Sequence, residues 1–149
     1  MQNNIEEINE DLEKVVDGSK FDEIIEDISK WGKILMIKIT PSFVIEIKDF
    51  MPTGTYGHGY YNFNTKGSSI SGHLKASDIE KIVFSSKIHI GMLSHSVSFN
   101  DAYGENIFKV FVTRNENKRY IIEYQDNDNV YVYKPTMQDL IKIMEGNFK

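Results

Sequence analysis

The feature that most constrains the fold is a change in the spacing of apolar residues at Lys33. Before this point, apolar side chains recur every three or four residues, as they do along one face of an α-helix. After it, short runs rich in β-branched and aromatic residues follow one another between turn residues. Helices do not alternate with these runs, which disfavours a Rossmann-type parallel sheet and favours an antiparallel α+β fold.

The first thirty residues are expected to form two amphipathic helices. Their apolar residues are Ile5, Ile8, Leu12, Val15 and Val16, and then Phe21, Ile24, Ile25, Ile28 and Trp31. Asp17-Gly18-Ser19 interrupts the pattern between them, and Gly32 is expected to end the second helix as a C-terminal cap. A last helix is expected to begin after Pro135, with Thr136 as its N-terminal cap.

Between these helices we expect about eight or nine strands. The runs with strand character are Ile34–Ile39, Phe43–Lys48, Tyr60–Asn64, Ser69–Lys75, Ile79–Ser86, Ile88–Asn100, Asn106–Thr113, Tyr120–Tyr124 and Val130–Tyr133. Asn106–Thr113 is too apolar for a strand with one wet face, so it is expected at the centre of the sheet. The prediction is α+β: two N-terminal helices, a long antiparallel sheet and a C-terminal helix, all in one domain of residues 1–149.

Charge and composition exclude several classes of protein. The net charge is −5 and the sequence contains no run of basic residues, which argues against a nucleic-acid binder. Apolar runs are too short to insert into a membrane and the acidic N-terminus is unlike a signal peptide, so a cytosolic protein is expected. The chain has no cysteine, which excludes disulfides, thiolate metal sites and a cysteine nucleophile. A metal site must therefore use the four histidines, carboxylates, tyrosines or methionines.

Sequence motifs of the common enzyme classes are also absent. The chain lacks the G-x-S-x-G element of α/β-hydrolases, the phosphate-binding glycine motifs and the H-E-x-x-H zinc motif. His89 and His95 lie six residues apart and are interpreted as surface positions of one strand, too far apart to share a metal ion. These observations argue against an enzyme.

The segment Gly54–Lys75 is the least generic part of the chain. It contains five of the ten glycines, three of the eight tyrosines and two of the four histidines, His58 and His73. One interpretation is an aromatic hairpin whose glycines serve turns and bulges. The other is a surface for a flat, metal-containing ligand such as haem, because haem iron accepts a neutral histidine nitrogen or a tyrosinate and the porphyrin needs apolar walls. Residue types alone leave both open.

An ordered set of motifs resembles the HutX/ChuX-type intracellular haem-utilisation carriers. The matching motifs are Trp31-Gly32, Gly57-His58-Gly59-Tyr60-Tyr61-Asn62, Ser71-Gly72-His73-Leu74-Lys75-Ala76, Gly91-Met92, His95-Ser96-Val97-Ser98-Phe99-Asn100, Gly104 and Phe108-Lys109-Val110-Phe111-Val112. The resemblance implies a HemS/ChuX-like fold and a homodimer in which two extended antiparallel sheets form opposed concave surfaces. It also implies haem binding in the bacterial cytosol, downstream of haem import. The segment Tyr120–Tyr133 departs from the more directly helical tail of this family, and its role stays open.

The resemblance also implies a set of binding residues. His73 matches the family's haem-linked histidine, and His58 matches the histidine of the H-G-Y motif. Lys75 is a candidate partner for a haem propionate, and Tyr60 either packs the sheet or contacts the porphyrin. Some relatives carry another ligand histidine where this chain has Ile39. Either His73 therefore acts alone, or His58 or a tyrosine completes the coordination.

Three functions remain open from the sequence. The first is a non-catalytic haem carrier or store in iron acquisition, with transient contacts to a haem importer or a haem-degrading enzyme. The second is an enzyme of haem or linear-tetrapyrrole breakdown, either oxygenase-like or reductase-like. The third is a protein-interaction module that uses the edges of its sheet.

Overall fold

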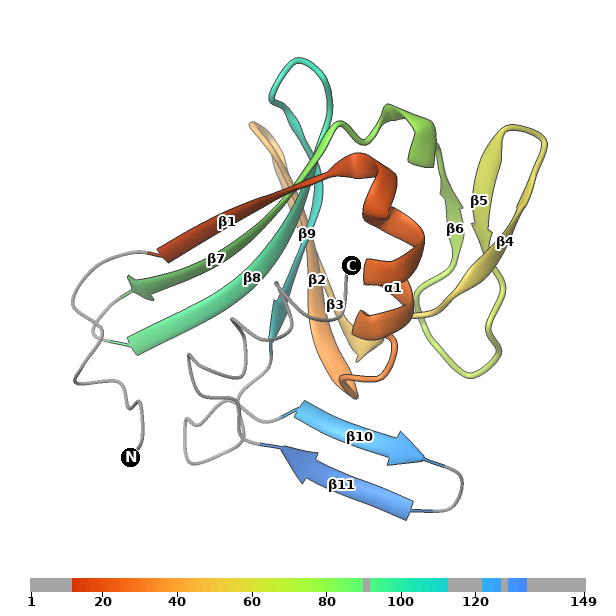
Figure 1. The fold of residues 1–149 in the computed structure, drawn as a ribbon, viewed down its shortest axis with the longest axis vertical. Helices are drawn as coiled ribbons and strands as arrows, with labels where there is room; N and C mark the ends of the chain where they lie inside the picture. The colour runs from red at the N-terminus through yellow and green to blue at the C-terminus, as the bar shows by residue number, and fades with distance from the viewer. Residues whose placement is uncertain (1–11, 90–91, 113–121, 127–128, 134–149) are drawn as a thin grey trace.

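The computed structural model describes residues 12–89, 92–112, 122–126 and 129–133 of the chain (Figure 1). In these ranges the largest unit is a six-stranded antiparallel sheet. Its strands, in spatial order, are β1 (Leu12–Asp17), β7 (Lys81–His89), β8 (Met92–Asn100), β9 (Asn106–Val112), β2 (Lys33–Thr40) and β3 (Phe43–Phe50). The predicted antiparallel α+β class is confirmed, and Asn106–Val112 lies inside the sheet as expected.

Two smaller antiparallel sheets accompany the large one. A three-stranded sheet consists of β4 (Gly54–Gly57), β5 (Tyr60–Phe63) and β6 (Gly72–Leu74), in that order. The strands β10 (Ile122–Asp126) and β11 (Asn129–Tyr133) pair as the hairpin expected within Tyr120–Tyr133. Two 3-10 turns, η2 (Gly18–Lys20) and η3 (Ala76–Asp78), complete the described elements together with one α-helix.

The helix α1 (Phe21–Ile28) lies between the large sheet and the three-stranded sheet and packs against both (Figure 1). Its four apolar residues, Phe21, Ile24, Ile25 and Ile28, are all buried. Phe21 makes edge-on ring contacts with Phe99 of β8 and with Tyr61 of β5, at centroid distances of 5.9 and 5.1 Å. Burial of each such side chain stabilises the folded protein by roughly 1.5–3 kcal/mol relative to leaving the side chain exposed to water.

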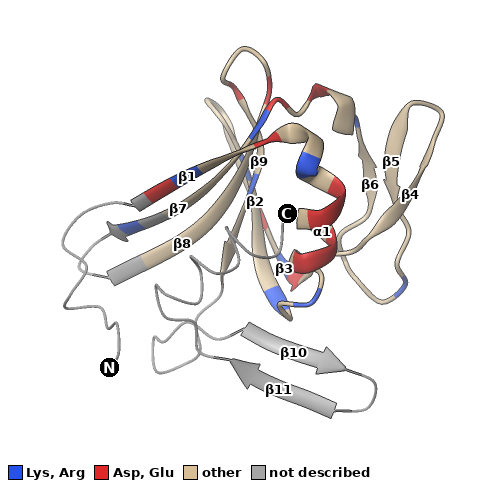
Figure 2. Cartoon of the chain, viewed as in Figure 1, with Lys and Arg blue, Asp and Glu red and all other residues tan. Residues whose placement is uncertain are grey.

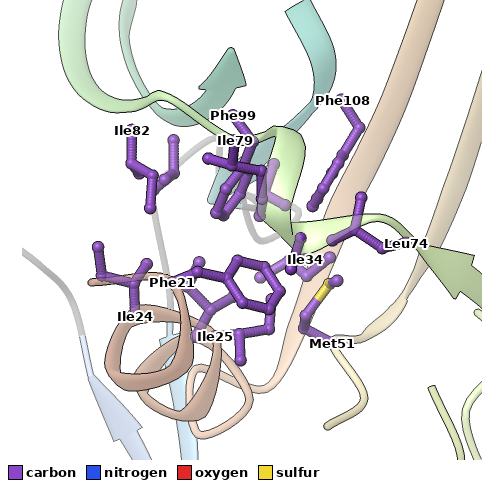
Figure 3. Packing of buried hydrophobic residues seen from close by; sticks show 14 of the residues in the cluster. Phe21, Ile24, Ile25, Ile34, Met51, Leu74, Ile79, Ile82, Phe99 and Phe108 are labelled. Carbon is purple, nitrogen blue, oxygen red and sulfur yellow. The ribbon is translucent and has the colours of Figure 1, made fainter. Parts of the chain in front are cut away.

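The hydrophobic core is therefore continuous across the helix. Figure 3 shows Ile82, Phe99 and Phe108 of the large sheet on one side of this cluster, with Leu74 of β6 on another. Met51, on the connection between β3 and β4, is fully buried in the same cluster. Because the inner side of the three-stranded sheet is used for this contact, its opposite side is left to solvent.

The expectation of two N-terminal helices is wrong. Leu12–Asp17 is the edge strand β1, which pairs antiparallel with β7, so that Val16 lies opposite Ile82. Val16 packs against the core while Val15 is exposed, as alternation along a strand requires. Residues 1–11 and the predicted helix after Pro135 lie outside the described residues. The predicted second helix is confirmed, and hydrogen-bonded turns continue it as far as Trp31, where Gly32 adopts a φ of 80°.

The interpretation of Ile88–Asn100 as one continuous strand is also wrong. The chain reverses between His89 and Met92, so that β7 and β8 form an antiparallel pair with Ser86 opposite His95. His89 and His95 thus belong to two neighbouring strands. No helix in the described residues is long and apolar enough to cross a bilayer.

Candidate functional site

The three-stranded sheet brings the candidate residues of Gly54–Lys75 onto one small element. Tyr61 pairs with Leu74, and both are buried toward α1. Asn62 pairs with His73, so the two side chains share the opposite, outer face. Tyr60 lies on this face two residues before Asn62, with 43% of its surface exposed. Lys75 is exposed just after β6.

His58 occupies the tip of the hairpin that joins β4 to β5. Gly57 pairs with Tyr60, which leaves a two-residue turn of His58 and Gly59. Their φ angles are 57° and 84°, the left-handed pair that a type I′ turn requires. Glycine adopts this conformation without strain, whereas His58 is the one non-glycine residue with positive φ in the described ranges. The imidazole is exposed at the turn.

Strand β4 was not anticipated from the sequence, although it holds the His58 turn in place. Glycines are depleted in strands, so Gly54-Thr55-Tyr56-Gly57 carries no strand signal of its own. Gly54 lies so close to β5 that a Cβ there would be 1.9 Å from the carbonyl oxygen of Asn62. Its N–H donates to the hydroxyl oxygen of Tyr61 at 2.6 Å. The glycine is thus required by the close pairing of the two strands.

Asn62 is the residue of the site that sequence reasoning did not assign. Its Nδ2 lies 3.2 Å from the carbonyl oxygens of Thr55 and Gly57 and 3.3 Å from that of Tyr60. Its Oδ1 lies 2.6 Å from Nδ1 of His73. One amide therefore contacts the backbone of the His58 turn and the ring of His73. Two signals were available: Asn62 ends the matched motif Gly57-His58-Gly59-Tyr60-Tyr61-Asn62, and asparagine is uncommon within a strand.

The segment that contains His73 combines an aromatic ring with few charged residues, all of them basic. The ring of Tyr60 lies edge-on to the imidazole, with 6.3 Å between the centroids. Between Gly54 and Lys75 the only charged residues are Lys66 and Lys75, both basic, in a chain of net charge −5. In Figure 2 the β4–β5 hairpin has the colour of uncharged residues, in contrast to the acidic helix α1. This local charge suits a planar apolar ligand with anionic substituents.

Two of the three tyrosines in this segment are engaged in structural hydrogen bonds. The Tyr56 hydroxyl donates to Oδ1 of Asp22 at 2.5 Å, which ties β4 to α1. Partial burial and the Asp22 carboxylate raise the pKa of Tyr56 above its ordinary value. Burial likewise raises the pKa of Tyr61. Neither phenol is therefore a source of tyrosinate near neutral pH.

The other histidines belong to the large sheet. His95 is only 2% exposed, which corrects its interpretation as a surface position. It follows the core-facing alternation of Val97 and Phe99 along β8, and burial lowers its pKa to about 4. The side chain of His89 lies outside the described residues. Ile39 is exposed near the end of β2, on the large sheet and not among the residues around His73.

The donor set around His73 fits haem as cargo. An exposed imidazole with one ring nitrogen hydrogen-bonded is the usual form of a histidine that ligates iron through its other nitrogen. Tyr60 supplies an aromatic wall beside it, and the exposed Lys75 is a cation two residues along the chain. Among the described residues no group of three or more histidine, aspartate or glutamate side chains is arranged to hold a bare metal ion.

Comparisons with known proteins show which family this chain resembles. The model of the haem utilisation ChuX/HutX family matches residues 14–126. The intracellular heme transport protein HutX of Vibrio cholerae is 35% identical over 114 residues, covering 76% of this chain and 59% of HutX. This chain thus spans less than two thirds of the length of that relative.

Solved structures similar to this chain include a protein named ChuX. The heme-binding protein ChuX superposes with a TM-score of 0.68 at 28% identity, covering 72% of this chain and 67% of ChuX. ChuS, described as an Escherichia coli heme oxygenase, gives a TM-score of 0.61 at 16% identity over 73% of this chain and 33% of ChuS, which supports a shared fold alone. On the extent of the family match, which includes more than half of its residues, this chain belongs to the haem utilisation ChuX/HutX family.

Proposed function

We propose that this protein binds haem on the outer face of the three-stranded sheet and serves as an intracellular haem carrier or store. The observation that carries the proposal is the exposed His73 imidazole, held by Asn62 beside the ring of Tyr60. Membership of the ChuX/HutX family and the transport role named for HutX support haem as the ligand. The intracellular location named for HutX supports a bacterial cytosolic setting.

Each candidate residue has a separate role in this proposal. His73 ligates the iron through Nε2, because Nδ1 is in contact with Asn62. Tyr60 lies against the porphyrin edge, and Lys75 forms a charge-assisted hydrogen bond with a propionate. His58 is either the second axial ligand or a wall of the site, from the exposed tip of the β4–β5 hairpin.

A carrier is favoured over an enzyme by the openness of this surface. Oxygen chemistry at haem depends on excluding water and on a positioned source of protons. The side chains of His58, Tyr60 and His73 are instead exposed on the outer face and turn of a small sheet. Such a surface lets haem enter and leave by transient contact with an importer or a haem-degrading enzyme.

A homodimer is proposed on the basis of the exposed end of the β2–β3 hairpin. β3 is the last strand of the large sheet as described, and four apolar residues near its start are exposed: Ile39, Phe43, Val44 and Ile45. An apolar strand at a sheet edge promotes uncontrolled association unless it is covered. A second copy of the chain is the expected cover. Light scattering at micromolar concentration should give twice the chain mass, and a monomer would contradict the dimer.

Titration with hemin tests the proposed ligand. The wild-type protein should bind hemin with a sharp change in the Soret band, and His73→Ala should weaken binding because the iron–nitrogen bond is lost. Circular dichroism should show that the variant keeps its fold, since His73 is exposed. An unchanged Soret band and affinity in His73→Ala would exclude His73 as the ligand.

A further inference from the structure

We propose that Asn62 is a positioning residue that holds His73 in the Nδ1–H tautomer and thereby directs an unprotonated Nε2 toward the iron. The part of the proposal that concerns iron rests on the haem-binding function proposed above. The part that concerns the tautomer rests on the hydrogen bonds of Asn62 alone. Asn62 contacts the ligand through His73, so its effect on binding is indirect.

The orientation of the Asn62 amide follows from its backbone partners. Three carbonyl oxygens, of Thr55, Gly57 and Tyr60, lie within 3.3 Å of one end of the amide. Carbonyl oxygens only accept hydrogen bonds, so the NH2 group must occupy that end. The reversed amide would place its oxygen against these three acceptors. The contacts therefore fix Oδ1 at the opposite end, facing His73.

The tautomer of His73 follows from the same reasoning. Oδ1 of Asn62 can only accept, and it lies 2.6 Å from Nδ1 of His73. Nδ1 must then carry the proton that is donated. In a neutral imidazole only one nitrogen is protonated, so Nε2 keeps its lone pair. Hydrogen bonding of the distal nitrogen is the usual way in which proteins orient a metal-binding histidine and raise its basicity.

Asn62 also links His73 to the hairpin that presents His58. Gly57 and Tyr60 flank the turn, and both carbonyls accept from the same amide that holds the imidazole. Asn62 contacts the turn through Nδ2 and His73 through Oδ1, so substitutions of Asn62 can separate the two contacts. Asn62→Asp keeps an acceptor for His73 and removes the donors to the turn. Asn62→Leu removes both.

The tautomer gives a preference for porphyrins that contain a coordinating metal. A lone pair on Nε2 stabilises bound haem through an axial bond, but it adds nothing to a metal-free porphyrin of the same shape and charge. The contribution of Asn62 should therefore appear with hemin and be absent with metal-free protoporphyrin. A purely structural contribution would affect both ligands alike.

The first experiment uses the ligand-free protein. Long-range 15N–1H NMR spectra at about pH 9, where ordinary imidazoles are neutral, report which His73 nitrogen carries the proton. Wild type and Asn62→Asp should show the Nδ1–H form, and Asn62→Leu should lose this preference. A wild-type protein with the proton on Nε2, or an Asn62→Leu variant that keeps the Nδ1–H form, would overturn the proposal.

The second experiment compares hemin with metal-free protoporphyrin by fluorescence quenching of Trp31, the only tryptophan of the chain. Asn62→Leu should weaken hemin binding about 10- to 100-fold, the range found when the hydrogen-bond partner of a metal-binding histidine is removed. Its affinity for protoporphyrin should be unchanged. Equal losses for both ligands would show a merely structural role.

The two experiments distinguish a failure of the haem-binding function from a failure of the positioning role of Asn62. If wild type binds no hemin, the haem-binding function is wrong, while the NMR spectra still decide the tautomer. If wild type binds hemin through His73 and Asn62→Leu changes neither tautomer nor affinity, the positioning role is wrong and the function stands.

Discussion

Burial of His95 makes the stability of the protein dependent on pH in a calculable way. This side chain is 2% exposed and its pKa is lowered to about 4, against an ordinary value of 6.5. The unfolded chain therefore binds a proton at His95 at higher pH than the native protein does. The stabilisation is fully present above pH 6.5 and is lost as the pH falls toward 4.

The size of the effect follows from the two pKa values. One pKa unit corresponds to 1.36 kcal/mol, so the protein should lose about 2 kcal/mol of unfolding free energy between pH 7.5 and 5 from this group alone. For a chain of this length, that loss lowers Tm by roughly 4–8 °C. Carboxylates contribute little in this range, because ordinary aspartate and glutamate side chains titrate near pH 4.

Urea unfolding at the two pH values measures the effect. Trp31 is buried and is the only tryptophan, so its fluorescence reports the loss of the core. His95→Gln provides the comparison, because it leaves the other three histidines of the chain in place. The variant should lose about 2 kcal/mol less than wild type over this range. An equal loss in the two proteins would show that protonation of His95 does not cause the destabilisation.

Three further changes test the site and its support. Lys75→Gln should weaken hemin binding several-fold, about 1 kcal/mol, while the matched Lys66→Gln should not; equal effects would assign the loss to net charge. Tyr56→Phe should lower the unfolding free energy by about 0.5–1.5 kcal/mol because the bond to Asp22 is removed, which urea titration would show or refute. His58→Asn should raise Tm slightly, because asparagine suits the left-handed turn, and reduced hemin affinity in the same variant would identify His58 as a haem contact.

Helices and strands could be predicted from the sequence where the spacing of apolar residues fits only one kind of secondary structure. Phe21, Ile24, Ile25 and Ile28 repeat at helical spacing within one amphipathic stretch, and they form α1. The three positions Leu12, Val15 and Val16 fit a helix face equally well. Pairing with β7 decides between the two structures, and this tertiary contact is not visible in local spacing.

In the candidate site, too, residue types could be recognised from the sequence, whereas contacts between strands could not. The histidines and tyrosines of Gly54–Lys75 could be singled out by residue type, and pairing through β5 places His73 beside Asn62. The role of Asn62 could not be predicted, because it depends on four contacts made across strands β4, β5 and β6. The burial of His95 was missed for a similar reason: the reversal between His89 and Met92 is hidden in a continuous stretch of strand-forming residues.

The central claim is that His73 ligates haem iron, and chemical rescue tests it most directly. Absorption spectra of the hemin complex should show a histidine-ligated Soret band in wild type and its loss in His73→Gly. Added imidazole should restore the band in the variant, because it supplies the missing nitrogen to the iron position that His73 would occupy. A His73→Gly spectrum identical to wild type, or one that imidazole does not change, would contradict ligation by His73.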